Sequence, residues 1–425
     1  MLRFSSCPPP PPPSFSSSVL LGFLFVALAS AATPFVHSWD TVGDVMAMHG
    51  KYKDAPTAAD VAFVAQHYAT VTTGTACSDT VNTTHTIEQS VLAVAAQIKA
   101  ANPAVKMGMY WRSDFALELA DCSGFAGEWA AHPEWRLRDD SGRLVGSKGH
   151  YYIDYSNPAA AAFFARVLVN VTRAVLPSGA PVLDFVYIDG DPGQSDTTQI
   201  HPDISANRSL ALVNAIYGCF GDIQRQLDAA GHGQKIILNG MDTAWSAARH
   251  VATGAAGSMF DHWSILQFVN RTDGVFNATM MDQAFALVAH NLTNVTTQIK
   301  GWPGPIVRQR DQYPPNMPTP ATPAQMQQLA AERFNSELAL FLLVASEFDY
   351  WIYSAFWGFD DFVPGHPDST VPATFFPQAR CPLGPPAGPY TRRPGTWTYT
   401  RDFAHAHVFV DLTNRTASRV DFAAC

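Results

Sequence analysis

The chain has few charged residues, and after residue 31 it has no long uninterrupted apolar run. Only 15% of its 425 residues are Asp, Glu, Lys or Arg, and 27 basic side chains stand against 36 acidic ones, for a formal net charge of -9. Nucleic acids and anionic membranes are bound through clustered Lys and Arg, so this balance argues against both partners. Without a later apolar stretch of about 20 residues, we expect no stable membrane anchor.

The first 31 residues have the pattern of a secretory signal peptide. Arg3 precedes the apolar run 19–29, which is followed by small residues at a cleavage site, Ala29-Ser30-Ala31. A retained anchor is the alternative, but the run is too short to span a bilayer. We therefore predict a secreted glycoprotein, because the chain also carries Asn-x-Ser/Thr sequons at Asn82, Asn170, Asn207, Asn270, Asn277, Asn291, Asn294 and Asn414.

Cysteine is scarce, and Cys7 belongs to the predicted signal peptide. The remaining five cysteines allow two disulfides and one free thiol, whose pairing the sequence leaves open. We expect Cys77 to pair with Cys122, and Cys381 with Cys425. No CxxC or His-rich spacing predicts a metal site, and we expect no cofactor.

The chain is rich in apolar residues (47%), and predicted strands alternate with predicted helices. This alternation favours a parallel sheet covered by helices, and eight units favour a (β/α)8 TIM barrel. An open doubly wound sheet is the competitor, but no glycine-rich nucleotide-binding motif follows any strand. One long helix is predicted over 278–299, and the predicted strands cover 34–39, 68–73, 107–111, 185–189, 236–239, 258–261, 305–308 and 350–353.

The composition changes near the C-terminus, where Pro, Gly and aromatic residues dominate between residues 362 and 394. Short alternating runs then predict a small antiparallel β module. We therefore expect three parts: a signal peptide (1–31), a catalytic barrel (32–365) and a C-terminal β module (366–425).

Polar and aromatic residues follow the predicted strands, at the edge where barrel enzymes place their active sites. Rings can stack on sugars, and polar side chains can bind hydroxyl groups. Two carboxylates are needed to cleave a glycosidic bond, and Asp189 and Asp261, after strands four and six, face each other across the rim. The candidate site residues at the ends of the predicted strands are Trp39, Asp40, Trp111, Arg112, Asp189, Asp191, Asn239, Asp261, His262, Arg308 and Tyr353.

Structural roles for the same residues remain open. Either aspartate can instead cap a turn, and Asp191 or His262 can take the acid role in place of Asp261. Trp111 can equally fill the core of a barrel.

Two segments carry a resemblance to a known group of enzymes. Residues 152–158 (Y-I-D-Y-S-N-P), and after a helix residues 183–191 (L-D-F-V-Y-I-D-G-D), resemble secreted (β/α)8 glycoside hydrolases of the α-glucosidase and α-galactosidase type. The resemblance implies Asp189 as the nucleophile and Asp261 as the acid/base. The segments L-G-P-P (383–386), Y-T-R-D-F (399–403) and V-F-V (408–410) are similar to the C-terminal modules of uncharacterised glycosyl hydrolase families of this barrel type.

We therefore predict a glycoside hydrolase that acts on an oligo- or polysaccharide by a two-carboxylate, retaining route. Asp191, Arg112, Asn239 and Arg308 are expected to contact sugar hydroxyls or to tune the two carboxylates. A barrel that binds carbohydrate without cleaving it is the alternative. The sequence leaves the sugar and the oligomeric state open.

Overall fold

The computed structural model describes residues 35–48, 57–74, 85–114, 116, 122–147, 150–190, 200–241, 244–261, 263, 276–291, 295–301, 323–353 and 376–425. The predicted signal peptide and the predicted domain boundary near residue 365 lie outside these residues.

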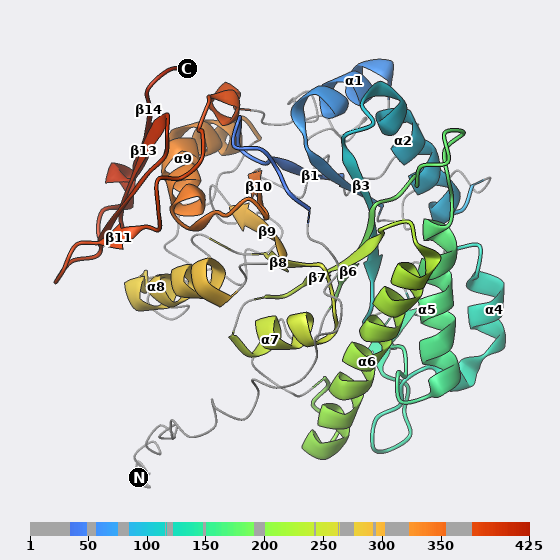
Figure 1. The fold of residues 1–425 in the computed structure, drawn as a ribbon. Coiled ribbons are helices and arrows are strands. Elements are labelled where there is room, and N and C mark those ends of the chain that lie inside the picture. The colour runs from blue at the N-terminus through green and yellow to red at the C-terminus, as the bar shows by residue number, and fades with distance from the viewer. Residues whose placement is uncertain are drawn as a thin grey trace, which may run out of the picture. The chain divides into compact units, whose positions relative to one another are not determined.

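Eight strands form one parallel sheet that closes into a barrel (Figure 1). Each strand pairs with the next one in chain order, and Arg112 of the third strand lies opposite Asp189 of the fourth. A parallel bridge between Asp44 and Trp351 joins the first strand to the last, which confirms the predicted (β/α)8 barrel. The strands are β1 (Val45–Met48), β2 (Thr70–Thr73), β3 (Lys106–Arg112), β6 (Phe185–Asp189), β7 (Lys235–Asn239), β8 (Gly257–Phe260), β9 (Thr296–Gly301) and β10 (Asp349–Tyr353).

Helices connect the strands and cover the outside of the barrel. Two of them begin with a capping box, in which the Thr57 or Thr86 hydroxyl accepts a hydrogen bond from a backbone N–H three residues later. A third helix begins after Asn157, whose side chain accepts a hydrogen bond from the Ala159 N–H, and has a proline as its first residue. The helices are α1 (Ala58–His67), α2 (Ile87–Ala101), α5 (Pro158–Thr172), α6 (Ala206–Ala230), α7 (Ala244–Ala252), α8 (Ala278–Ala286) with the π-helical turn η4 (Leu287–Asn291), and α9 (Pro323–Val344).

Alternate residues of each strand point into the barrel, because successive side chains of a strand lie on opposite faces. The interior contains Tyr110 and Tyr187, whose rings stack with their centroids 5.7 Å apart. Phe35 precedes β1, is 7% exposed and packs its ring 5.8 Å from that of Phe185. The part of the barrel near the amino ends of the strands is therefore filled mainly by aromatic and aliphatic side chains, with the buried Thr296 among them, and charged groups gather toward the carboxyl ends of the strands.

An insertion lies between β3 and α5. It contains α4 (Ala126–Ala131), the 3-10 turn η2 (Pro133–Trp135) and a short hairpin of β4 (Gly146–Ser147) and β5 (His150–Tyr151). The Ala116 N–H donates to the Tyr151 carbonyl at 3.0 Å, and the Ile153 N–H donates to the Asp114 carbonyl at 3.3 Å. The hairpin therefore lies beside the carboxyl end of β3.

The C-terminal β module is a four-stranded antiparallel sheet that packs on α9. Its strands are β11 (Thr391–Arg392), β12 (Thr398–Asp402), β13 (Ala406–Asp411) and β14 (Arg419–Phe422), with the 3-10 turns η7 (Pro377–Arg380) and η8 (Arg415–Ala417). The Arg401 guanidinium donates to three carbonyl groups at the end of α9, those of Leu342, Leu343 and Ala345. It thereby satisfies carbonyls that a helix terminus leaves without a partner.

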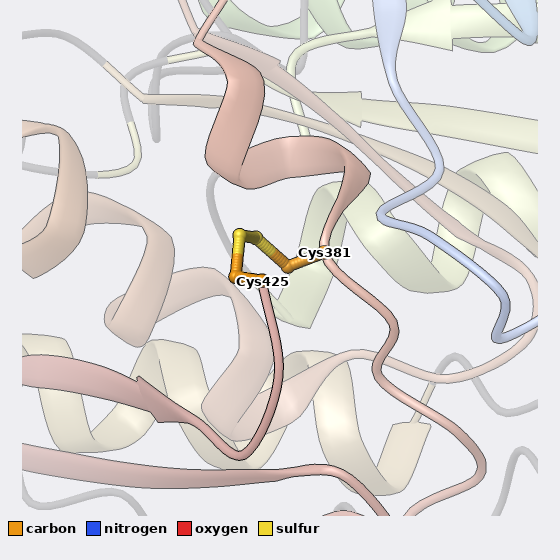
Figure 2. The surroundings of a disulfide bond; sticks show 2 residues. All are labelled: Cys381 and Cys425. Atoms are coloured by element: carbon orange, nitrogen blue, oxygen red, sulfur yellow. A yellow bond between two sulfur atoms is a disulfide. The ribbon is translucent and has the colours of Figure 1, made fainter.

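A disulfide between Cys381 and Cys425 links the chain before β11 to the segment after β14 (Figure 2). This pairing confirms the prediction. Cys122 is also disulfide-bonded, while Cys77, its predicted partner, lies outside the described residues. Cys219 is a free, buried thiol.

Loss of the Cys381–Cys425 bond is expected to destabilise the protein. The bond closes a loop with a sequence separation of 44. Because the crosslink restricts the unfolded chain, Cys425→Ser is expected to lower the free energy of unfolding by about 2 to 4 kcal/mol. Urea unfolding without reductant measures the change, and the Cys381→Ser/Cys425→Ser double variant is the control, which should lose no more than the single variant. An unchanged urea midpoint would contradict the expectation.

Two predicted strands are wrong. The first barrel strand is Val45–Met48 rather than residues 34–39, which precede it. The seventh is Thr296–Gly301, which overlaps the helix predicted over 278–299; residues 305–308 lie outside the described residues.

Among the helices of the described part of the chain, none is long and apolar enough to cross a membrane.

Candidate active site

Polar side chains converge inside the barrel at the carboxyl ends of five neighbouring strands. The alternation along each strand sets this arrangement: Tyr187 points inward, so Asp189 two residues later does too. By the same rule Met259 places Asp261 inward at the end of β8. One residue from each of these strands shares this site: Arg112 from β3, Asp189 from β6, Asn239 from β7, Asp261 after β8 and Lys300 from β9; Tyr110 and Asp114 bond to two of them and complete it.

Asp189 is held by three hydrogen-bond donors. Tyr110 Oη donates to Oδ2, while Asn239 Nδ2 and the Gly190 N–H each donate to Oδ1 at 2.7 Å. Burial alone would raise the pKa of Asp189, but these hydrogen bonds and the Arg112 charge outweigh it and lower the pKa below its usual value. Asp189 is therefore ionised at neutral pH.

Asp261 has the opposite electrostatic environment. It is 9% exposed, and Asn239 Nδ2 donates to its Oδ2 at the longer distance of 3.4 Å. Burial, followed by the negative charge of Asp189, raises the pKa of Asp261 to about 8, against the opposing effects of Asn239 and the Lys300 charge. Asp261 is therefore protonated at neutral pH.

A single amide links the two carboxyl groups. Nδ2 of Asn239 lies 2.7 Å from Oδ1 of Asp189 and 3.4 Å from Oδ2 of Asp261. Those two oxygens are consequently at most about 6 Å apart, a separation at which two carboxyl groups can act on one glycosidic bond. The predicted pair of aspartates thus lies together in the site, bridged by the predicted residue Asn239.

Arg112 is part of a rigid ion pair next to Asp189. Its Nε and Nη2 donate to Asp114 at 2.9 and 2.7 Å. Asp114 packs directly on Gly190, whose φ of +76° and lack of a side chain leave room for the carboxylate. The guanidinium is therefore fixed in place on the strand that pairs with β6.

Three residues of this site, Tyr110, Asp114 and Lys300, were not predicted from the sequence. Tyr110 is separated from the predicted Arg112 by one residue, so strand alternation was the signal that could have revealed it. Asp114 lies two residues after the end of β3, so its place near a strand end was the signal that could have revealed it. Lys300 fell next to a helix predicted over 278–299, so nothing identified it as a residue at a strand end.

Two predicted sugar contacts point away from the barrel interior. Trp111 is 0% exposed and packs in the core between the sheet and its helices, because it neighbours the inward-facing Tyr110. Tyr353 donates its hydroxyl to the Ala330 carbonyl of α9 at 2.8 Å and stacks on Trp351. The prediction that these rings bind sugar is wrong, since both belong to the packing between strands and helices.

Trp39 and Asp40 lie at the opposite end of the barrel. They precede β1, and the neighbouring His37 N–H donates to the carbonyl of Glu347, which precedes β10. Trp39 packs against Phe403 of the β module, with ring centroids 5.5 Å apart. The predicted substrate contact by these two residues is therefore wrong.

Three further predicted contacts, Asp191, His262 and Arg308, lie outside the described residues. Within the described part of the chain, no group of three or more His, Cys, Asp or Glu side chains is placed to hold a metal ion.

A family model matches most of the barrel and much of the β module. Hypothetical glycosyl hydrolase family 15 matches residues 99–407, a range that includes Asp189 and Asp261. The chain belongs to this family. It is therefore a glycoside hydrolase, with a carbohydrate as its substrate.

Several solved structures are similar to this chain at low sequence identity. A family GH13_31 enzyme matches with a TM-score of 0.50 and 10% identity over 87% of this chain and 92% of its own. An alpha-amylase from Lactobacillus plantarum matches with a TM-score of 0.44 and 11% identity, over 87% of each chain. The glycoside hydrolase domain of PelA from Pseudomonas aeruginosa matches with a TM-score of 0.41 and 12% identity, over 74% of this chain and 96% of that domain. No curated protein sequence matches the chain.

Proposed function

We propose that this glycoside hydrolase retains the anomeric configuration of its substrate, an oligo- or polysaccharide. Asp189 acts as the nucleophile and Asp261 as the general acid/base. The observation that carries the proposal is the pair of carboxyl groups bridged by the Asn239 amide, in surroundings that lower the pKa of Asp189 and raise the pKa of Asp261. The bridge limits the distance between Asp189 Oδ1 and Asp261 Oδ2 to about 6 Å, which supports retention, because retaining enzymes hold their carboxyl groups about 5 to 5.5 Å apart and inverting enzymes about 6.5 to 9.5 Å.

The division of roles follows from the electrostatics. A nucleophile must be ionised, and Tyr110, Arg112 and Asn239 favour the charged form of Asp189. A general acid must hold a proton at the working pH, and burial beside Asp189 favours the neutral form of Asp261. Reversing the two roles would require each carboxyl group to act in its less stable form.

The stereochemistry of the first product tests the mechanism. The purified protein is incubated with a panel of aryl glycosides and polysaccharides, and the anomeric protons of the first product are followed by NMR. We expect the product to have the configuration of the substrate. An inverted product would overturn the retaining route, whereas binding of a saccharide without any product would favour the carbohydrate-binding alternative.

Tyr110→Phe is expected to shift the acidic limb of the activity profile. The tyrosine hydroxyl donates to Asp189 and lowers its pKa, so without that donor the pKa of Asp189 rises. A hydrogen bond to a charged group contributes about 1.5 to 3 kcal/mol, so the limb should move up by about one to two pH units. The measurement is kcat/KM as a function of pH, and an unmoved acidic limb would show that this donor does not control Asp189.

We also propose that the protein enters the secretory pathway. The pattern of residues 1–31 supports this, as does the Cys381–Cys425 disulfide, since disulfides persist mainly in oxidising compartments. Detection of the protein in the medium of expressing cells, and its loss on deletion of residues 2–31, would test the proposal.

A further inference from the structure

Lys300 is a fully buried lysine at the carboxyl end of β9. Its side chain is 0% exposed, and it belongs to the inward-facing set of β9 that includes Thr296 and Gln298. Thr296 marks the inward face, because its hydroxyl accepts a hydrogen bond from the N–H of Phe35, which packs in the barrel interior. The lysine ammonium is thus held inside the barrel and not on its surface.

The register of the sheet places Lys300 next to Asp261. In the pairing of β8 with β9, Met259 lies opposite Gln298 and Phe260 opposite Ile299. Asp261 follows Phe260 directly after β8, and Lys300 follows Ile299 within β9, so both residues continue the inward alternation. The Trp263 N–H donates to the Lys300 carbonyl at 3.0 Å, which fixes the turn after β8 against the end of β9.

Buried charges require compensation, because an ammonium group taken out of water costs several kcal/mol unless opposite charge or dipoles surround it. Among the described residues, the groups that face Asp261 are the carboxylate of Asp189 from β6, the neutral amide of Asn239 from β7 and the ammonium of Lys300 from β9. The negative charge of Asp189 favours a protonated Asp261, and the positive charge of Lys300 favours an ionised Asp261. The lysine therefore opposes the effect of burial on the general acid.

We propose that Lys300 is a positioning residue that adjusts the proton affinity of Asp261 during the catalytic cycle. The inference rests on the proposed function, since it presupposes that Asp261 is the acid/base. Lys300 touches no reacting atom in this scheme and acts only through the charge that it holds beside Asp261.

Asp261 changes charge twice in each turnover. In the first step its proton moves to the glycosidic oxygen, the bond from C1 to that oxygen breaks, and C1 bonds to an oxygen of Asp189. Asp261 is then a buried carboxylate beside Lys300. In the second step a water molecule attacks C1, gives its proton to Asp261, and the bond from C1 to Asp189 breaks, which restores both aspartates. The lysine stabilises the anionic form between the steps and makes Asp261 a stronger acid than burial alone would allow.

Lys300→Met tests the proposal through the pH profile. Without the positive charge, Asp261 binds its proton more tightly, so the alkaline limb of kcat/KM is expected to move up by about one pH unit or more. The weaker acid should also lower kcat/KM about tenfold for glycosides with a poor leaving group, while dinitrophenyl glycosides, which depart without protonation, should be hardly affected. Lys300→Arg keeps the charge and should retain the wild-type limb.

Lys99→Met is the matched control. Lys99 is also buried (6% exposed), but it pairs with Asp184 at 2.6 Å, at the other end of the barrel. Removal of this lysine can cost stability, yet it should leave the alkaline limb where it is. If the limb moves in Lys99→Met as it does in Lys300→Met, the effect is not specific to the site and the proposal is overturned.

The outcomes separate this proposal from the proposed function. An inactive wild-type protein would refute the function itself. An active enzyme whose alkaline limb is unchanged in folded Lys300→Met would refute only the role of Lys300. If Lys300→Met does not fold, the Asp261→Asn/Lys300→Met double variant decides: folding of the double variant supports coupling of the two residues, and its failure shows that the lysine serves the fold and not Asp261.

Discussion

Asp189→Asn is expected to lower kcat/KM by at least about 10⁴-fold on any substrate that the wild-type enzyme cleaves. The amide cannot form the glycosyl-enzyme bond. Among the described residues of the site, no other carboxylate occupies the position of Asp189, at the end of β6 and bonded to Asn239, so none can replace it as the nucleophile. The fold should persist, since the amide is nearly isosteric with the carboxylate: its oxygen, in the place of Oδ1, still accepts from the Gly190 N–H, and its NH2 group, in the place of Oδ2, can donate to the Tyr110 hydroxyl. Circular dichroism and the thermal midpoint are the controls, and near-wild-type turnover would remove Asp189 from the mechanism.

Azide provides a second measurement on the same residue. In Asp189→Ala, the space left by the carboxylate can admit a small anion, which attacks C1 in its place. We expect added azide to restore cleavage of dinitrophenyl glycosides and to give a glycosyl azide of inverted configuration, because one displacement replaces two. A glycosyl azide of retained configuration would place the nucleophile elsewhere.

Asp261→Asn is expected to lower kcat/KM by about 10² to 10⁴-fold for substrates with poor leaving groups. Dinitrophenyl glycosides should be affected much less in the first step, because their leaving group needs no proton. The alkaline limb of the wild-type profile, expected near the pKa of about 8 that burial and Asp189 give to Asp261, should disappear in this variant. An alkaline limb that survives would assign the acid role to another group.

Asp261→Asn should also be more stable than the wild type in alkaline solution. The pKa of Asp261 is higher in the folded protein than the value of about 3.9 expected for an unfolded chain, so the fold favours the neutral carboxyl group. That contribution is complete below about pH 4 and is lost as the pH rises through about 8. Asn does not titrate, so the thermal midpoint of Asp261→Asn should exceed that of the wild type by several degrees at pH 9 and by little at pH 4. Equal midpoints at both pH values would contradict the buried, neutral carboxyl group.

The two strands that the sequence analysis misplaced show the limit of hydrophobic patterns. In β9, Thr296, Gln298 and Lys300 face the interior of the barrel and Ile299 faces the helices, so the strand has no apolar run. The apolar residue Phe35 was instead assigned to the first strand, although it packs inside the barrel ahead of β1. A barrel interior that accepts polar residues cannot be recognised before the strands are paired.

The alternation of side chains between the two faces of a strand explains why the predicted sugar contact of Trp111 is wrong. Trp111 and Arg112 are adjacent in the sequence, and both lie at the carboxyl end of β3. Only the pairing of β3 with β6, in which Arg112 lies opposite Asp189, decides that the arginine faces the site and the tryptophan faces the helices. A shift of one residue would exchange them.

The sequence by itself determined the barrel and identified the two aspartates that we propose as the catalytic pair. Alternation of strands and helices predicted eight units, and the two aspartates were identified from their positions at the ends of the fourth and sixth predicted strands together with the resemblance to glycoside hydrolases. The tertiary structure decided which neighbours surround each aspartate. Tyr110 and Arg112 favour the charged form of Asp189, while burial beside that charge favours the neutral form of Asp261. These opposite states arise from distances between strands that are far apart in the sequence, and no local pattern of residues encodes such distances.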